Sequence, residues 1–279
     1  MTISKQTVVF ILSEVRSGST WLSYVLGSHS EAVHLGEYYR PFTMPNHIAC
    51  RLCQAKGKKQ CDYLHGIQDV EISQAFDFAF KRFNKNWLID CSKQLDWLNI
   101  FINSQNYNIK IIHLHRDPRA WFASQKRRDS NLDIHLSLSK WIDTNNHITN
   151  KVKELNIKYI TPFYDELCLR PDLYFNDYLC PFIGFPFEES ALCYWEKEHH
   201  GLGGNGAAFN NLSRFESAQL NTGDDKYYQE MSQKLFFDSR WKTELTNSEI
   251  QIIESNHQIN DYLNHLGKSF EHFNLIFRS

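Results

Sequence analysis

Thr7-Val-Val-Phe-Ile-Leu-Ser-Glu-Val-Arg-Ser-Gly-Ser-Thr-Trp-Leu22 is the stretch that decides the fold. Its apolar run from Val8 to Leu12 is typical of a buried strand in a parallel sheet. From Trp21 on, apolar residues recur at helical spacing. The pattern therefore predicts a strand over 7–13, a tight loop, and a helix over 19–28.

The loop between these two elements has the composition of an anion-binding site. A helix start exposes unpaired amide N–H groups and the positive end of the helix dipole. Gly18 allows the backbone to approach a ligand closely. The side chains that add donors around it are Arg16, Ser17, Ser19 and Thr20. We expect the loop to bind phosphate, with an ordinary turn that holds no ligand as the alternative.

The loop departs from the standard phosphate-binding pattern Gly-x4-Gly-Lys-Ser/Thr. Ser13 stands in place of the first Gly, and Arg16 supplies the cation. Arg-Ser-Gly-Ser-Thr after a strand resembles the 5′-phosphosulfate loop of sulfotransferases, which use 3′-phosphoadenosine-5′-phosphosulfate (PAPS). The resemblance implies that residues 16–20 and the adjacent Trp21 contact PAPS.

A second segment strengthens the resemblance. Residues 109–116 are predicted to form a buried strand that ends at Arg116, and Pro118 suits the first turn of a following helix. Sulfotransferases hold the 3′-phosphate of PAPS with an Arg at a strand end and a Ser eight residues later, which here is Ser124. Arg128 lies one helical turn beyond Ser124, at the offset of a third 3′-phosphate contact in tyrosylprotein sulfotransferases.

Two further matches concern the nucleotide. The segment around Tyr164 resembles the Tyr-Glu-Asp-Leu segment of sulfotransferases, whose Tyr touches the nucleotide; a Tyr that only anchors the next helix is the alternative. The Gly-rich stretch with Gly204-Asn205, followed by the segment 238–245, resembles nucleotide-side segments of several sulfotransferase branches. We assign Gly204 and Asn205 no role.

Glu37 is the predicted general base. It follows a short apolar segment, and tyrosylprotein sulfotransferases have a Gly-Glu in this region whose Glu takes the acceptor's proton. The spacing from Arg16 to Glu37 also matches that family. Burial would raise the pKa of Glu37 toward working pH. The alternatives are a solvated carboxylate that pairs with Arg40, and His34 as the base, since cytosolic sulfotransferases use a His.

Lys93 is the predicted electrostatic catalyst. It follows the apolar run 87–91, and the related tyrosylprotein enzymes have a Lys after a strand at a similar place. Negative charge builds on the bridging oxygen as the sulfuryl group leaves, so a positioned ammonium stabilises the transition state more than the ground state. A surface Lys at a strand end is the alternative.

A cysteine-rich stretch at about 44–68 is predicted to be an insert in the domain. Its spacing, Cys50-x2-Cys53 followed by Cys61-x3-His65, fits a structural zinc site with four protein ligands. Three reduced cysteines in a loop are the alternative. The seven cysteines of the chain are expected to be reduced, because no secretion signal precedes them.

Composition excludes several classes of function. The net charge of −2 gives no sign of bulk electrostatic binding to nucleic acid or membrane. No apolar run is long enough to span a bilayer. We therefore expect a cytoplasmic enzyme whose partner is an acceptor substrate with a hydroxyl group, of unknown oligomeric state.

The order of elements predicts an α/β fold. Strands are expected at 7–13, 32–35, 87–91, 109–114 and 157–163. Helices are expected at 19–28, 72–84, 95–104, 118–128, 135–154, 171–180, 226–236 and 246–265. Alternation of strands and helices implies parallel pairing with right-handed crossovers. The expectation is one sulfotransferase domain over residues 1–279, with a P-loop-like three-layer α/β/α fold and a mainly parallel central sheet.

The resemblance implies transfer of a sulfuryl group from PAPS to a hydroxyl or amine, which leaves adenosine 3′,5′-bisphosphate. A nucleotide kinase with a P-loop-like fold, a non-catalytic nucleotide-binding protein and a zinc-organised interaction protein are the alternatives. The absent Gly-x4-Gly-Lys-Ser/Thr pattern argues against the kinase.

Overall fold

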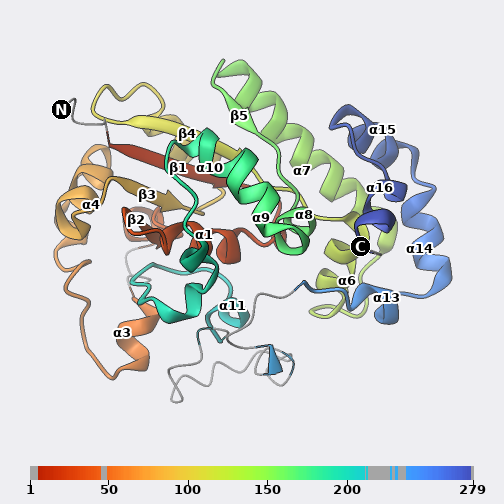
Figure 1. Cartoon of the computed structure of the whole chain (residues 1–279), viewed down its shortest axis with the longest axis horizontal. Coiled ribbons are helices and arrows are strands. Elements are labelled where there is room, and N and C mark those ends of the chain that lie inside the picture. Colours follow the sequence, from red (N-terminus) through yellow and green to blue (C-terminus); the bar gives the residue numbers. More distant parts are fainter. Residues whose placement is uncertain are drawn as a thin grey trace.

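The computed structural model describes residues 6–44, 49–210, 212, 227, 230, 231 and 237–277 (Figure 1). Its centre is a five-stranded sheet with the order β2-β3-β1-β4-β5, and all of its pairs are parallel. The strands are β1 (Thr7–Leu12), β2 (Ala32–Gly36), β3 (Trp87–Asp90), β4 (Asn108–His113) and β5 (Tyr159–Ile160). The expected fold class is confirmed.

The strand order creates one point where the direction of winding changes. From β1 the chain moves to β2 and β3 on one side of the sheet, and then crosses to β4 and β5 on the other side. Ligands of open α/β sheets bind at the carboxyl ends of the strands next to such a switch point. All six residues of β1 are buried, because the strand has neighbours on both edges and helices on both faces.

One face of the sheet is covered by α4 (Ala75–Phe83), α5 (Leu95–Phe101) and α7 (Ile134–Glu154). The ring of Phe10 in β1 packs edge-on against Phe76 of α4, with centroids 5.5 Å apart. On the same face, His113 of β4 lies 3.1 Å from the amide oxygen of Asn145 in α7.

The opposite face is covered by α1 (Ser19–Gly27) and by the segment that includes α10 (Cys180–Ile183). Ser23 of α1 lies 2.6 Å from Nδ1 of His34 in β2. The ammonium of Lys110 in β4 lies 5.0 Å from the ring centroid of Phe182 in α10. With helices on both faces, the structure has the three layers that the sequence predicts.

The C-terminal helices form a second hydrophobic cluster beside α6 (Pro118–Lys126) and α7 (Figure 1). They are α13 (Trp241–Glu244), α14 (Asn247–Glu254), α15 (His257–His265) and α16 (Phe270–Ile276). This packing brings the residues just before α13 next to α6. None of the helices in the described ranges is both long and apolar enough to cross a bilayer.

Several element boundaries differ from expectation. The predicted single helix 246–265 is two helices, because the side chain of Asn256 accepts a hydrogen bond from the Ile259 amide and starts α15 anew. The strand expected at 157–163 is reduced to β5. The helix expected at 171–180 is α9 (Pro171–Tyr174), a π-helical turn (Phe175–Leu179) and α10. The helix expected at 226–236 lies almost wholly outside the described residues.

Smaller shifts occur elsewhere. The helix expected at 72–84 begins as a 3₁₀ turn (Ile72–Gln74), and those expected at 95–104 and 118–128 end earlier, as α5 and α6. Short helices that the sequence analysis did not identify are α2 (Arg40–Thr43), α3 (Arg51–Ala55), α8 (Tyr164–Leu169), α11 (Gly206–Asn210), α13 and α16.

Candidate active site

The loop after β1 leads into the N-terminus of α1. Gly18 is the N-cap, with φ of 92°, and as a glycine it makes no side-chain capping hydrogen bond. A Cβ built on Gly18 would overlap the ring of Tyr164, so the position requires glycine on two grounds. Ser17, Ser19 and Thr20 are buried around the turn. The amides of a helix start of this kind can receive an anion, and phosphate binding by this loop stays a prediction.

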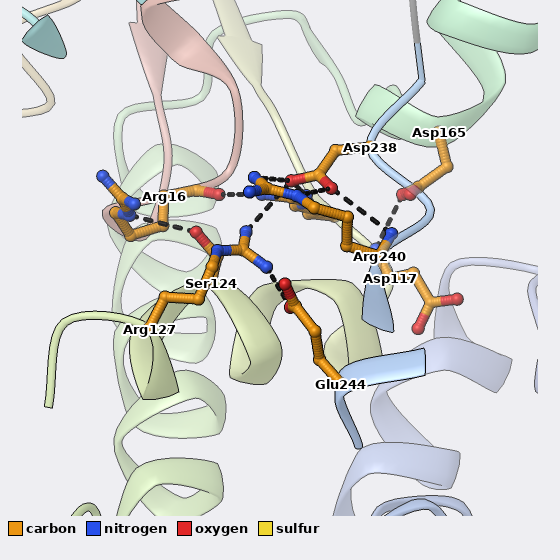
Figure 2. A network of polar contacts seen from close by, with 9 residues as sticks. Arg16, Asp117, Ser124, Arg127, Asp165, Asp238, Arg240 and Glu244 are labelled. Carbon is orange, nitrogen blue, oxygen red and sulfur yellow. Dashed lines mark hydrogen bonds and ion pairs between the residues drawn. The ribbon is translucent and has the colours of Figure 1, made fainter. Parts of the chain in front are cut away.

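Arg116 and Ser124 both contact the loop. The guanidinium of Arg116 donates a hydrogen bond to the carbonyl oxygen of Arg16, over 2.9 Å, and the guanidinium of Arg16 donates to Oγ of Ser124, over 3.1 Å (Figure 2). Arg116 follows β4 and Ser124 lies on α6, so these contacts join segments about 100 residues apart in the chain. The two predicted phosphate sites are neighbours in the structure.

Asp238 lies at the centre of this cluster. One of its oxygens, Oδ2, accepts hydrogen bonds from Arg116, Arg127 and Arg240 over 3.2, 3.0 and 3.0 Å. Burial on its own raises the pKa of Asp238, but the three guanidiniums outweigh burial and hold it well below the usual range. The carboxylate thus holds the three guanidiniums together.

Four arginines gather around Asp238 in this cluster. They are Arg16, Arg116, Arg127 and Arg240; Asp238 pairs with the last three and Glu244 with Arg127, and the buried Asp117 and Asp165 lie beside them (Figure 2). Guanidinium groups bind phosphates through charge-assisted hydrogen bonds, so this cluster is a candidate site for a phosphate of a nucleotide. The sequence analysis assigned no role to Arg127, Asp238 or Arg240; the resemblance of the segment 238–245 to nucleotide-side segments was the one signal.

Arg128 does not lie on the helix face of Ser124, contrary to the prediction. Helix α6 ends at Lys126, so Arg128 lies beyond it and is exposed. Its neighbour Arg127 turns into the cluster instead, because Asp238 and Glu244 hold its guanidinium.

A second cluster lies at the ends of β2 and β3. Glu37 directly follows β2, and Lys93 comes three residues after β3. The ammonium of Lys93 donates hydrogen bonds to Oε1 of Glu37 and to the carbonyl oxygen of Cys91, each over 2.9 Å. Arg40 donates to Oε2 of Glu37 through Nε, over 2.6 Å. Both oxygens of the predicted base therefore face cations.

These cations reverse the expected pKa shift. Burial does raise the pKa of Glu37, but Lys93 and Arg40 together outweigh burial, so the pKa lies below its usual value rather than above it. For Lys93, burial lowers the pKa, while the negative forms of Cys91, Glu37 and Asp90 raise it more, and the net direction is upward. Lys93 is thus a charged group in a buried position, not a surface lysine.

His34 occupies a core position. Its side chain is 2 % exposed, and its Nδ1 lies 2.6 Å from Oγ of Ser23. Burial, together with the nearby His199, lowers its pKa well below the usual value. A Cβ on Gly201 would overlap the other side of the ring. The geometry therefore favours Glu37 over His34 as the group that can meet an acceptor.

The segment 201–205 connects the loop after β1 with the Glu37 cluster. The amide of Glu37 donates to the carbonyl oxygen of Leu202 over 2.6 Å, and the amide of Asn205 donates to Oγ1 of Thr20 over 3.1 Å. A Cβ on Gly203 would lie 2.9 Å from Oε2 of Glu37. This Gly-rich stretch, to which the sequence analysis gave no role, lies directly against the candidate site.

Tyr164 packs against residues of the loop after β1 and of α1. Its ring meets Trp21 edge-on, with centroids 5.2 Å apart, and the guanidinium of Arg116 lies 5.1 Å from its centroid. Both rings are buried. The Tyr164 ring thus packs directly against Gly18 and Arg116, and Trp21 packs against the Tyr164 ring. Contact of either ring with a nucleotide stays a prediction.

A separate group of metal-binding side chains lies in the cysteine-rich insert. Sulfurs of Cys50, Cys53 and Cys61 lie 3.7, 3.6 and 3.6 Å from Nδ1 of His200. The predicted fourth ligand, His65, is exposed, and its Nδ1 contacts Gln60 instead. The prediction of His65 is wrong, because tertiary packing brings His200 to the cysteines from a position about 140–150 residues away in the chain.

Comparison with known proteins agrees with this geometry. The profile of a family described as "Sulfotransferase family" matches residues 8–189, which is well over half of the chain. The structure resembles the sulfotransferase domain from the Synechococcus PCC 7002 olefin synthase, with 18% identity, a TM-score of 0.52 and coverage of 89% of this chain and 94% of that one. It also resembles the sulfotransferase domain from the curacin biosynthetic pathway, with 19% identity, a TM-score of 0.55 and coverage of 92% and 98%. At these identities the likeness shows the fold alone. No curated protein sequence matches the chain.

Proposed function

Because the chain belongs to the sulfotransferase family, we propose that it moves a sulfuryl group from PAPS to a hydroxyl or amine of an acceptor. One observation carries the proposal. The loop after β1, Glu37 after β2, Lys93 after β3 and Arg116 after β4 all follow the carboxyl ends of parallel strands, and these ends meet at one edge of the sheet. An anion cradle, a paired carboxylate and ammonium, and an arginine cluster thus share one site.

We assign the two ends of PAPS to the two halves of this site. The 5′-phosphosulfate would lie on the amides at the start of α1, with Arg16 to Thr20 around it. The 3′-phosphate would lie against Arg116 and Ser124, which hydrogen-bond to the same loop. We infer that Arg127 makes the third contact that the sequence predicted for Arg128, because its guanidinium already lies in the cluster.

The chemistry follows from the pair Glu37 and Lys93. As the acceptor oxygen or nitrogen forms its bond to sulfur, its proton passes to Glu37, and the bond between sulfur and the bridging oxygen breaks. Lys93 stabilises the charge that builds on that oxygen, and adenosine 3′,5′-bisphosphate leaves. When the ammonium turns from Glu37 to the bridging oxygen, one of the two cations that lower the pKa of Glu37 is withdrawn. The carboxylate then becomes a stronger base at the moment of transfer.

Binding and transfer can be tested on the full chain. Calorimetric titration with adenosine 3′,5′-bisphosphate should show binding that Arg116→Ala weakens by about tenfold or more, the cost of lost charge-assisted hydrogen bonds. Arg170→Ala removes an equal charge at an exposed position and should bind as the wild type does. Glu37→Ala should bind the nucleotide and fail in transfer.

Transfer itself should be followed with radiolabelled PAPS and a panel of alcohols, phenols and glycans. Tighter binding of Mg–ATP than of adenosine 3′,5′-bisphosphate would favour the kinase. Nucleotide binding with no transfer to any acceptor would favour the non-catalytic protein. Equal nucleotide affinity in the wild type and in Arg116→Ala would refute the assignment of the donor site.

A further inference from the structure

We propose that Cys50, Cys53, Cys61 and His200 bind one structural zinc ion. The four donor atoms lie within 4.8 Å of one another. Each sulfur is 3.6 to 3.7 Å from Nδ1 of His200. In a tetrahedral site with ordinary zinc–sulfur and zinc–nitrogen bonds, a sulfur and a nitrogen are about 3.6 Å apart. The three sulfur-to-nitrogen distances therefore already match those that a zinc ion would impose.

The types of ligand atom indicate which metal fits the site. Three thiolates and one imidazole in a tetrahedral arrangement are typical of zinc, whereas calcium and magnesium require oxygen ligands. All three cysteines are at most 5 % exposed and none forms a disulfide. Four protein ligands leave no open position for a substrate, so the ion would have a structural role.

A carboxylate lies near the other ring nitrogen of the histidine. Nδ1 of His200 faces the sulfurs, and Nε2 lies 3.4 Å from a carboxylate oxygen of Glu198. Glu198 in turn pairs with Lys56, which lies in the same insert as the cysteines. A histidine that ligates a metal through one nitrogen commonly donates its other N–H to a carboxylate. Three cysteines packed only as small apolar residues would not require this arrangement.

The ion would fasten the segment that reaches the candidate active site. The backbone of Leu202, two residues after His200, forms isolated β-bridges with Cys50 and with Gly36. The same segment continues to the Asn205 amide, which binds Thr20. The zinc would thus hold the insert and the segment 201–205 together against the end of β2. The proposal depends on the geometry of these ligands alone, and holds whether or not the donor is PAPS.

Metal content of the untagged full chain tests the proposal. Mass spectrometry of the purified protein should find one zinc per chain, and a chelator should release it and make three additional thiols reactive. His200→Ala should lose the metal, while His65→Ala, the residue that the spacing of the sequence selects, should retain it. Cys61→Ser should likewise lose zinc, and Cys193→Ser, which alters a half-buried cysteine outside the cluster, should not.

Cobalt substitution keeps the test decisive where a variant fails to fold. The wild-type chain with Co²⁺ should show the intense visible bands of a tetrahedral site and sulfur-to-cobalt charge transfer. A folded wild-type protein without stoichiometric zinc after expression with added zinc would overturn the proposal. Full zinc in His200→Ala, or a cobalt spectrum without thiolate bands, would overturn it as well.

Discussion

The ammonium of Lys93 lies 2.9 Å from Oε1 of Glu37, so the proposed leaving-group stabiliser and the proposed base form one ion pair. The two side chains are only 14 % and 13 % exposed. Removal of either partner therefore leaves a charge in a buried position, with Arg40 as the remaining partner of Glu37.

The first prediction separates the roles of this pair. Glu37→Gln should lower kcat by about a hundredfold or more, the usual contribution of a general base, with little change in nucleotide affinity. Lys93→Met should lower kcat similarly, and because it removes a cation beside Glu37, it should shift the acidic limb of the pH–rate profile to higher pH. Glu31→Gln, at an exposed site just before β2, is the control. An unchanged acidic limb in Lys93→Met would contradict the proposed coupling.

The second prediction compares two adjacent arginines. Arg127→Ala should weaken binding of adenosine 3′,5′-bisphosphate by about tenfold, because it removes a guanidinium held in the cluster by Asp238 and Glu244. Arg128→Ala removes the same charge from an exposed position one residue later and should change affinity by less than about twofold. The opposite order of effects would restore the assignment made from the sequence spacing.

The third prediction concerns the turn at Gly18. Gly18→Ala should destabilise the protein and abolish nucleotide binding, because Cβ would overlap the Tyr164 ring. Gly184→Ala is a matched control: its φ of 98° is close to the 92° of Gly18, but its Cβ would meet nothing within 4 Å. Gly184→Ala should lower the free energy of unfolding only by the cost of a non-glycine residue at positive φ, about 1–2 kcal/mol. Equal loss of thermal stability in the two variants would contradict the close approach of Tyr164.

The fourth prediction is a pH dependence of stability. Burial lowers the pKa of His113 to about 3, so the folded state holds this imidazole neutral while the unfolded chain protonates it below about pH 6.5. The contribution of His113 to the free energy of unfolding should therefore fall as the pH drops from about 6.5 toward 3, by up to about 1.4 kcal/mol per pH unit.

Other buried groups titrate in the same range, and some act in the opposite direction: burial raises the pKa of Asp90 to about 6. Chemical denaturation of His113→Gln beside the wild type isolates the single contribution. Their difference in stability should narrow as the pH falls through this window, whereas His135→Gln, at an exposed position, should follow the wild type. A constant difference across the window would show that His113 is not held neutral.

The predictions from sequence were most successful where the deciding interactions are local. The order strand, tight turn, helix at residues 7–28 follows from an apolar run, a glycine and helical spacing, and the structure has all three elements. The fold class followed from the alternation of such elements. The trio Cys50, Cys53 and Cys61 was also visible, because its members lie within twelve residues of one another and meet around one point.

Errors occurred where a distant segment decides the outcome. His200, and not His65, lies beside the three cysteines, because a segment about 140–150 residues away packs against them. Arg127 enters the arginine cluster because α13 and the residues before it supply Asp238 and Glu244. The pKa of Glu37 moves downward because Lys93, 56 residues away, and Arg40 outweigh burial.

The sequence by itself determined the parallel α/β architecture, the tight turn before α1 and the residue types of the candidate site. Periodicity, glycine conformation and helix-end electrostatics act over a few residues, so they can be inferred from the sequence alone. Only the tertiary structure decided which charges pair, which arginine enters the cluster and which histidine joins the cysteines. These outcomes depend on packing between segments that lie far apart in the chain, and no local pattern encodes their distances.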